Sequence, residues 1–296
     1  MTTSWAEFLQ RFSSPAMDKL VYLITSFGSE HFYVAALAFI YWIWDKHKGY
    51  RLAMVLLSSM LVNNWLKFAC AIPRPQPSNK VRVIFPETGG GYAFPSGHAQ
   101  GSTTSWGWLS HEIRTRRFCL LSGIVIFLVS VSRIYLNVHW PVDVIGGFFI
   151  GLAWVGLWQL IFRNYDETRW SPYLRLASSF FIPMLLFLIY PKGDSPMLLG
   201  LLMGLPLGRY LDERYLGWNE RAATKQQCLK VVTGGIGYGA LRYGLRALFD
   251  WICPGSGLLN LVRYALIALW TTFVAPLVFV KLGWAGCEKQ QLHTEG

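Results

Sequence analysis

Long apolar segments separated by short polar connections account for most of this chain. The segments predicted to cross a membrane are 31–44, 51–68, 97–111, 118–134, 139–162, 174–190, 196–209, 230–249 and 260–281. Several of them approach the roughly 20 residues that a helix needs to cross the hydrocarbon core of a bilayer. Residues 1–30 instead alternate polar and apolar groups. We interpret them as an amphipathic surface segment, with a re-entrant hairpin as the alternative.

The composition supports the same class of protein. Of the 296 residues, 53% are hydrophobic and only 15% are charged, whereas soluble domains carry about 25% charged residues. The predicted fold class is therefore all-α, a polytopic integral membrane helical bundle. Its longest polar interruption, 69–96, is rich in proline and glycine and is predicted to be a loop. Five scattered cysteines without a CxxC spacing favour neither a zinc site nor a disulfide framework.

Lysine and arginine are distributed unevenly between the two sets of connecting loops. One set carries Lys46, Lys48, Arg51, Arg114, Arg116, Arg117, Arg163, Arg169, Arg175, Arg209, Arg214, Arg221, Lys225, Lys230, Lys281 and Lys289. The opposite set carries Arg11, Lys19, Lys67, Arg74, Lys80, Arg82, Arg133 and Lys192. The positive-inside rule makes the richer set cytoplasmic. Membrane orientation thus accounts for most of the net charge of +11, and no nucleic-acid partner is expected.

Three clusters of unusual polar residues fall on the non-cytoplasmic side in this topology. The clusters are Lys67 with Arg74 and Pro75, then Pro95-Ser96-Gly97-His98, and finally Arg133 with His139 and Asp143. Each lies at an end of a predicted span, so the three are expected at one membrane depth. Together they place three cations, two histidines and one carboxylate near the level of the lipid headgroups.

The residue types in these clusters predict an anion site with a nucleophile. The forked guanidinium groups of Arg74 and Arg133 suit phosphate oxygens. Ser96 and Gly97 open a helix, whose unpaired N–H groups and dipole also favour an anion. Gly97, which has no side chain, lets a ligand approach the backbone closely.

The two histidines are expected to divide the chemistry between them. His139 and Asp143 are four residues apart, so the carboxylate can hold one ring nitrogen and leave the other free to attack. His98 is then available as the general acid for the leaving oxygen. A metal site is the rival interpretation of the His139–Asp143 spacing, but three neighbouring cations would repel a divalent ion.

The motifs resemble those of the type 2 phosphatidic acid phosphatase (PAP2) superfamily, which includes glucose-6-phosphatases, sphingosine-phosphate phosphatases and vanadium haloperoxidases. Lys67-x6-Arg74-Pro75, Pro95-Ser96-Gly97-His98 and Ser132-Arg133-x5-His139-x3-Asp143 match its three-part signature in order and spacing. The resemblance implies that His139 is a phosphohistidine nucleophile, Asp143 its partner and His98 the acid. It implies that Lys67, Arg74, Ser96, Gly97 and Arg133 bind phosphate, and that no metal or other cofactor is needed.

The resemblance also implies an organisation for the chain. Residues 31–190 would form a PAP2-like six-helix catalytic core, preceded by the surface segment 1–30. Residues 191–296 would add about three C-terminal transmembrane helices. The expected protein is a multi-pass membrane protein, in the plasma membrane or a bacterial inner membrane, with its active site on the non-cytoplasmic side.

Two features outside the signature invite an interpretation. Arg242 and Arg246 lie within a predicted span, where charge usually marks a binding site or an internal pair. Arg242 is a candidate contact for a lipid headgroup, with helix-to-helix pairing as the alternative, and Arg246 can snorkel toward Asp250. Glycines spaced four apart, at 147 and 151, at 200, 204 and 208, and at 235 and 239, predict close helix packing. Packing within the chain is the default; a homodimer and a monomer are both compatible with it.

These observations predict a metal-independent lipid phosphate phosphatase that works through a phosphohistidine. The expected substrate, met among membrane lipids, is phosphatidate, a sphingoid phosphate or a polyprenyl mono- or diphosphate. A sugar-phosphate phosphatase of the glucose-6-phosphatase type is the alternative. An anion transporter is the rival from another class; it accounts for the cations but not for His98 or for the pairing of His139 with Asp143.

Overall fold

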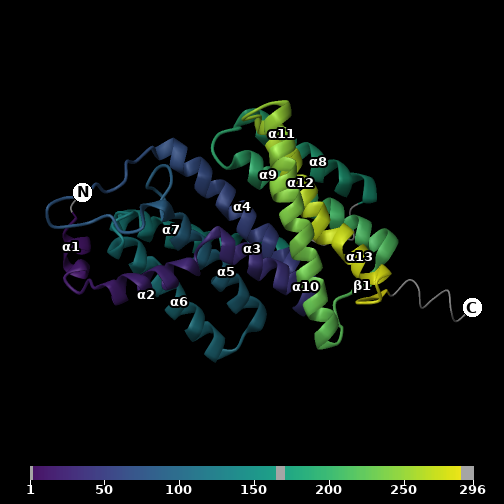
Figure 1. The fold of residues 1–296 in the computed structure, drawn as a ribbon, viewed down its shortest axis with the longest axis horizontal. Coiled ribbons are helices and arrows are strands. Elements are labelled where there is room, and N and C mark those ends of the chain that lie inside the picture. Colours follow the sequence, from purple (N-terminus) through teal and green to yellow (C-terminus); the bar gives the residue numbers. More distant parts are fainter. Residues whose placement is uncertain (1–2, 165–170, 288–296) are drawn as a thin grey trace, which may run out of the picture. The chain divides into compact units, whose positions relative to one another are not determined.

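The structure is a computed structural model that describes residues 3–164 and 171–287, and it is built almost wholly of helices (Figure 1). The described chain divides into two compact units. The first comprises the residues up to Ala35 together with Ser58–Asn164. The second comprises Ala36–Leu57 and the described residues after 170. The predicted borders at residues 30 and 190 stay a prediction.

The first unit contains the three sequence motifs. Its helices are α1 (Ser4–Gln10), α2 (Pro15–Ser26), the start of α3 (Glu30–Phe39), the second half of α4 (Lys46–Cys70), the 3-10 turn η2 (Pro86–Thr88), α5 (Gly97–Ile113), α6 (Arg116–Tyr135) and α7 (Pro141–Asn164). Helix α5 packs against α6 and α7, and α1 and α2 pack against α6. Residues 3–30 therefore belong to the same compact unit as the motifs.

The second unit contains the remaining elements. They are η1 (Ile40–Trp44), α8 (Pro172–Ile189), α9 (Ser195–Leu211), η4 (Asp212–Leu216), β1 (Trp218–Asn219), α10 (Thr224–Gly239), η5 (Ala240–Gly244), α11 (Leu245–Ile252), α12 (Gly257–Leu269), η6 (Trp270–Val274), α13 (Ala275–Lys281) and β2 (Gly286–Cys287). Strands β1 and β2 pair antiparallel over two residues each. This short pairing leaves the predicted all-α class unchanged.

All nine predicted segments are helical, which confirms the predicted helical membrane protein. Within the described residues, four stretches are long and apolar enough to cross a membrane: α4, α6, α7 and the continuous stretch Gly257–Lys281. Helix α2 and the stretch Glu30–Trp44 form a fifth when taken together, although a bend of 49° separates them. Nine crossings stay a prediction.

Helix α5 is polar for a membrane protein because its side chains bond within the bundle. The Thr103 hydroxyl donates to the carbonyl of Ala99, and the Ser105 hydroxyl donates to that of Gly101. Toward α4, the Nε2 amide of Gln100 donates to the carbonyl of Ser59 at 2.8 Å. Small hydroxyl residues satisfied in this way let membrane helices approach closely. The helix can therefore place a polar first turn inside the bundle.

Helices α6 and α7 turn large apolar side chains outward. Leu121 and Phe127 on α6 and Ile145 and Phe149 on α7 are exposed although hydrophobic. An apolar surface of this kind is stable against lipid tails and unfavourable in water. It identifies the lipid-facing side of these two helices.

The glycine spacings have two different outcomes. The glycines at 147 and 151 lie against α5, and those at 200 and 204 lie against α12, which confirms close packing within the chain. Gly235 and Gly239 have no described atom within 4 Å of the position that a side chain would take. Packing within the chain, the default interpretation, is therefore wrong for this last pair among the described residues, because α10 turns this edge away from its neighbours; the alternative, a homodimer, stays a prediction. Spacing alone does not report which face of a helix meets a partner.

A cluster of charged residues lies beside the hydrophobic core of the second unit. Lys46 forms an ion pair of 3.0 Å with Asp212, and its Nζ also donates to the carbonyl of Trp218. The ammonium of Lys230 donates to the carbonyls of Trp42 and Glu220. Buried charges are tolerated when hydrogen bonds satisfy them in this way. The cluster anchors β1 beside the aromatic core that surrounds Trp218 and Phe279.

Candidate active site

The predicted nucleophile and its carboxylate partner lie together at the start of α7. His139 precedes the first helical residue, Pro141, by two positions, and Asp143 lies in the first turn. Nδ1 of His139 is 3.3 Å from Oδ2 of Asp143, and both side chains are buried. The backbone N–H of Trp140 donates to the same carboxylate oxygen at 2.8 Å. The carboxylate is thereby fixed on one side of the imidazole.

The other ring nitrogen of His139 faces Arg74. Nη1 of Arg74 lies 3.0 Å from Nε2 of His139. A guanidinium has only donors, so Nε2 must be the acceptor and carries the lone pair. Nδ1 then carries the proton and donates it to Asp143. This tautomer leaves the nucleophilic lone pair on the nitrogen beside the cation, as a phosphohistidine mechanism requires.

The loop before α5 holds Arg74 in place. Nε of Arg74 donates to the carbonyl of Gly91 at 2.9 Å, and Nη2 donates to that of Gly90 at 2.5 Å. Nη1 also donates to the carbonyl of Val138, next to His139, at 2.6 Å. Lys67, in the last turn of α4, donates to the carbonyl of Tyr92 at 2.6 Å. The glycine-rich loop thus joins two of the predicted cations.

Arg133 is the most deeply buried of the three cations, with an exposed fraction of 0%. Its Nη1 donates to the hydroxyl of Thr25 at 2.7 Å, and its Nη2 donates to the carbonyl of Thr88 at 2.7 Å. Its Nε is buried and has no hydrogen-bond partner among the described residues. A buried donor without a partner is costly, and an anion that accepts from it would remove that cost.

Sequence reasoning did not identify Thr25 and Thr88. Both are single hydroxyl residues in segments without a motif, and Thr25 lies 108 positions from the arginine that it contacts. Their signal appears only in the folded chain, where α2 packs against α6. The two residues that accept hydrogen bonds from Arg133, Thr25 and Thr88, therefore come from the N-terminal segment and from the turn η2.

The second motif opens α5 beside the start of α7. Ser96 is the N-cap of α5, and its hydroxyl accepts from the N–H of Ala99. The N–H of Ser96 donates to the carbonyl of Asp143 at 2.9 Å, which joins the second motif to the third. The N–H groups of Gly97 and His98 belong to the first helical turn, which has no carbonyl partners within the helix. They are the donors that α5 can offer to an anion.

Gly147 permits this meeting of α5 and α7. A Cβ at this position would lie 2.7 Å from the carbonyl oxygen of Ser96 and 3.1 Å from the backbone nitrogen of Gln100. No side chain fits between the two backbones. The absence of a Cβ therefore sets the distance between the helix that carries His98 and the helix that carries Asp143.

Positive charge dominates the electrostatics of the site. Among the described residues, neither Arg74 nor Arg133 forms an ion pair with a carboxylate within 4.0 Å. Burial lowers the pKa of Arg74, and the charge of Asp143 partly offsets that effect. Burial, followed by the charges of Arg74 and Arg133, also lowers the pKa of His139 well below its ordinary value of 6.5. This shift of the pKa favours the neutral form of the imidazole.

Other polar and cysteine residues can now be placed in the structure. Asn63 bridges helices: its Nδ2 donates to Oε1 of Gln100 at 2.8 Å and to the carbonyl of Pro95 at 3.3 Å. All five cysteines are free. The described residues contain no group of three or more His, Cys, Asp or Glu side chains arranged to hold a metal ion.

Arg242 and Arg246 lie in the second unit. Arg246 forms an ion pair of 3.5 Å with Asp250, as its spacing predicts. Nη1 of Arg242 donates to the hydroxyl of Tyr238 at 2.9 Å, one turn earlier. A headgroup contact through Arg242 stays a prediction.

Comparison with known proteins shows the family of the chain. The profile of the PAP2 superfamily matches residues 48–166, which include every residue of the three motifs. A second profile, described as the transmembrane extension of PAP2 superfamily phosphatases, matches residues 196–287. Together the two matches cover more than half of the chain. The protein is an integral membrane protein built of helices, and the chain belongs to the PAP2 superfamily.

Individual relatives are distant. Lipid phosphate phosphatase delta of Arabidopsis thaliana is 23% identical over 205 residues, 64% of this chain and 49% of that protein. Sphingosine-1-phosphate phosphatase 1 of Mus musculus is 27% identical over 221 residues, 68% of this chain and 50% of that protein. The chain thus spans about half the length of these two relatives. A crystal structure of a PAP2-type phosphatidylglycerolphosphate phosphatase from Bacillus subtilis is similar at a TM-score of 0.47 and 22% identity, over 56% of this chain and 87% of that one.

Proposed function

We propose that this protein is a membrane phosphatase that removes phosphate from a lipid phosphate on the non-cytoplasmic face. The observation that carries the proposal is the contact of Nε2 of His139 with Arg74 at 3.0 Å, while Nδ1 is held by Asp143. The lone pair on Nε2 of His139 points toward Arg74, the cation that would bind the phosphate. A cation site built only to bind an anion, as in a transporter, needs no oriented imidazole.

The reaction proceeds in two displacements. Nε2 of His139 attacks phosphorus, the bond to the ester oxygen breaks, and His98 donates a proton to the departing alcohol. Nδ1 keeps its proton, and Asp143 stabilises the positive charge that forms on the ring. Water then attacks phosphorus, the phosphorus–nitrogen bond breaks, and His98 takes a proton from that water.

The cations stabilise the transferring group. Arg74, Arg133 and Lys67 can neutralise the charge on the equatorial oxygens, together with the first N–H groups of α5. Nε of Arg133, which has no partner, is a ready donor for one of these oxygens. Most of the phosphate's binding energy in this scheme comes from groups that are already fixed before the substrate arrives.

A lipid substrate is supported by where the groups stand. Lys67 lies in the last turn of α4, Arg133 in the last turn of α6 and Asp143 in the first turn of α7. These three helices are long and apolar enough to cross a membrane. A phosphate at their ends is met at headgroup level while its hydrocarbon chains stay in the bilayer. The names of the two relatives, both phosphatases of lipid phosphates, agree with this substrate class.

A direct assay tests the proposal. The purified protein in detergent, with a chelator present, should release inorganic phosphate from phosphatidate, a sphingoid phosphate or a polyprenyl phosphate. His139→Ala should abolish turnover while the protein is still inserted and runs as a single species in size-exclusion chromatography. Phosphate release by this variant at the rate of the unmodified protein would overturn the assignment of the nucleophile.

A further inference from the structure

A tight turn joins α6 to α7 and separates Arg133 from His139. It consists of residues 135–138, with Asn137 in the left-handed region at φ 55°, a conformation that asparagine tolerates better than most residues. The N–H of Val138 donates back to the carbonyl of Arg133 at 3.3 Å. Since a predicted phosphate-binding group and the predicted nucleophile flank this turn, its shape sets the distance between their side chains.

Two carbonyls of the turn accept hydrogen bonds from distant parts of the first unit. The N–H of Ile84, in the loop before α5, donates to the carbonyl of Leu136 at 3.0 Å. The Nε2 amide of Gln10, in α1, donates to the carbonyl of Tyr135 at 2.7 Å across 125 positions of sequence. The turn is therefore held in place by the loop and by the N-terminal segment.

Gln10 bonds to this loop as well as to the turn. Its Nε2 amide donates to the carbonyl of Arg82 at 2.9 Å, and its Oε1 accepts from the N–H of Arg82 at 3.0 Å. The two amide protons of a glutamine allow both donor bonds, to Arg82 and to Tyr135. One side chain thus pairs with both backbone groups of a loop residue and ties that residue to the end of α6.

Asp18, in the first turn of α2, joins the same two residues through their side chains. Its Oδ1 accepts from the hydroxyl of Tyr135, and its Oδ2 forms an ion pair of 3.4 Å with Nη2 of Arg82. Exposed ion pairs contribute little to stability, and the side chain of Arg82 is 65% exposed. Of the two contacts, the hydrogen bonds of Gln10 are therefore expected to matter more.

Helix α2 extends this contact toward the phosphate site. Asp18, Val21 and Thr25 are three and four residues apart, so they share one face of the helix. Val21 belongs to the same buried hydrophobic cluster as Leu136 of the turn. One turn further on, the hydroxyl of Thr25 accepts from Nη1 of Arg133. A displacement of α2 would therefore also move an acceptor of Arg133.

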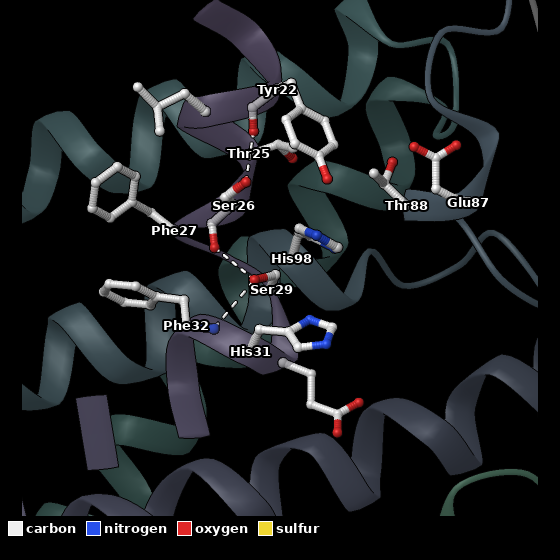
Figure 2. A pocket seen from close by; sticks show the side chains of 12 residues that line it. Tyr22, Thr25, Ser26, Phe27, Ser29, His31, Phe32, Glu87, Thr88 and His98 are labelled. Atoms are coloured by element: carbon white, nitrogen blue, oxygen red, sulfur yellow. Dashed lines mark hydrogen bonds between the residues drawn. The ribbon is translucent and has the colours of Figure 1, made fainter. Parts of the chain in front are cut away.

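Beyond Thr25, α2 ends in the bend that packs on His98. A Cβ on Gly28 would lie 3.2 Å from Cδ2 of His98. A cavity of about 690 Å³ lies beside this histidine, where side chains of α2, α3, η2 and α5 converge (Figure 2). Its lining includes Thr25 and Thr88, the two residues that accept hydrogen bonds from Arg133. The N-terminal helices thus contact the surroundings of both Arg133 and His98.

We propose that Gln10 and Asp18 are positioning residues for the phosphate site. By tying the loop before α5 to the end of α6, they hold the turn between Arg133 and His139, and with it the spacing of the guanidinium and the attacking imidazole. This inference rests on the phosphatase function proposed above. Both residues lie outside 48–166, the part of the chain that the PAP2 profile matches.

The test removes the hydrogen bonds of Gln10. Gln10→Leu keeps much of the volume of the side chain and loses its amide. In the purified full-length protein in detergent, the KM for p-nitrophenyl phosphate and the Kd of inorganic phosphate, measured by calorimetry, should both rise by about tenfold, or about 1.4 kcal/mol. Neither constant depends on the fraction of active protein, so a merely structural role would lower kcat and Tm and leave both unchanged.

Two milder variants and a matched control complete the set. Gln10→Glu keeps the acceptor for the N–H of Arg82 but, when ionised, has no donor, so both constants should rise again. Asp18→Asn loses only the ion pair and should change them less. Gln226→Leu is the control, because Gln226 likewise bonds two backbone groups, the carbonyl of Gly283 and the N–H of Ala223, in the second unit. It should keep the constants of the unmodified protein.

The outcomes separate the two proposals. Unchanged KM and Kd in Gln10→Glu and in any folded Gln10→Leu, or an equal rise in Gln226→Leu, would overturn the positioning role and leave the phosphatase standing. Failure of the unmodified protein to release phosphate from phosphatidate, a sphingoid phosphate, a polyprenyl phosphate and p-nitrophenyl phosphate would overturn the proposed function, and the Kd of inorganic phosphate would still decide whether Gln10 positions the anion site.

Discussion

The hydroxyl of Thr25 accepts a hydrogen bond of 2.7 Å from Nη1 of Arg133, although the two residues are 108 positions apart. Both side chains are buried, with exposed fractions of 1% and 0%. A residue of the N-terminal segment thus fixes the deepest cation of the predicted phosphate site. Part of the site's geometry is therefore supplied from outside the three sequence motifs.

Removing this acceptor should weaken phosphate binding. Thr25→Val keeps the shape of the side chain but leaves one buried N–H of Arg133 unpaired. A hydrogen bond to a charged group contributes about 1.5–3 kcal/mol, so kcat/KM should fall by about tenfold or more. The inhibition constant of inorganic phosphate should rise in parallel. Thr25→Ser restores the acceptor and should recover most of both values; equal losses in the two variants would contradict the role of the hydroxyl.

The role of His98 predicts a dependence on the leaving group. His98→Ala should slow alkyl phosphates, whose alkoxide leaves poorly without a proton, by about 10²–10⁴-fold. Aryl phosphates such as p-nitrophenyl phosphate need little protonation and should be slowed much less. The measurement is kcat for both classes in the variant and the unmodified protein. Equal slowing of the two classes would show that His98 is not the general acid.

The lowered pKa of His139 predicts that its imidazole is protonated only below the ordinary pKa of 6.5. Burial and the charges of Arg74 and Arg133 disfavour the imidazolium, so the ring stays neutral as the pH falls through 6.5 and is protonated only at lower pH. The free enzyme should therefore keep its nucleophile under mildly acidic conditions. The chain has six histidines, which makes NMR of ¹³C-labelled histidine practicable, and His139→Asn assigns the signal. Arg74→Gln removes one of the charges and should move the midpoint upward; a midpoint at or above 6.5 in the unmodified protein would contradict the electrostatic picture.

The lysine and arginine distribution predicts the orientation of the loops. A single cysteine at Asn79 should react with an impermeant thiol reagent in intact cells, and one at Arg117 only after permeabilisation. Four native cysteines are exposed and a fifth is partly exposed, so all five must first be replaced by serine: Cys70, Cys119, Cys228, Cys253 and Cys287. The reverse labelling pattern would place the site on the cytoplasmic face.

The sequence predicts that Arg242 contacts a lipid headgroup, and a substitution tests this prediction. Arg242→Ala should change the relative kcat/KM among lipid phosphates while sparing p-nitrophenyl phosphate, because only a lipid reaches beyond the reacting phosphorus. Tyr238→Phe provides the control, since it removes the hydroxyl that Arg242 contacts and keeps the cation. A uniform loss on all substrates, or a loss of stability alone, would make Arg242 structural.

The residues of the candidate site could be predicted from the sequence because their types and spacing mark them. The pairing of His139 with Asp143 follows from four residues of separation and needs no knowledge of the tertiary fold. The contacts of Thr25 and Thr88 follow only from the packing of α2 and η2 around Arg133. No local pattern marks a single threonine as the partner of a distant arginine.

Helix irregularities were equally hidden in the sequence. Single π-helical turns end helical stretches at η1 and η4 and interrupt them at η5 and η6, and hydropathy averages over them. The bend of 49° between α2 and α3 depends on contacts with α5 and α6 that a pattern of polar and apolar residues does not record. The failed prediction of packing within the chain at Gly235 has the same origin, since spacing does not tell which side of a helix has a neighbour in the chain.

The residues of the three motifs and the residues of the bend over His98 come from different stretches of the sequence, so the two can be varied independently. All residues of the three motifs lie within 67–143, whereas nine of the twelve residues that line the cavity of about 690 Å³ beside His98 lie within 22–32. With Thr25 kept for its hold on Arg133, that short stretch can be randomised as a cassette. Such a library changes the lining of this cavity while every residue of the three motifs stays unchanged.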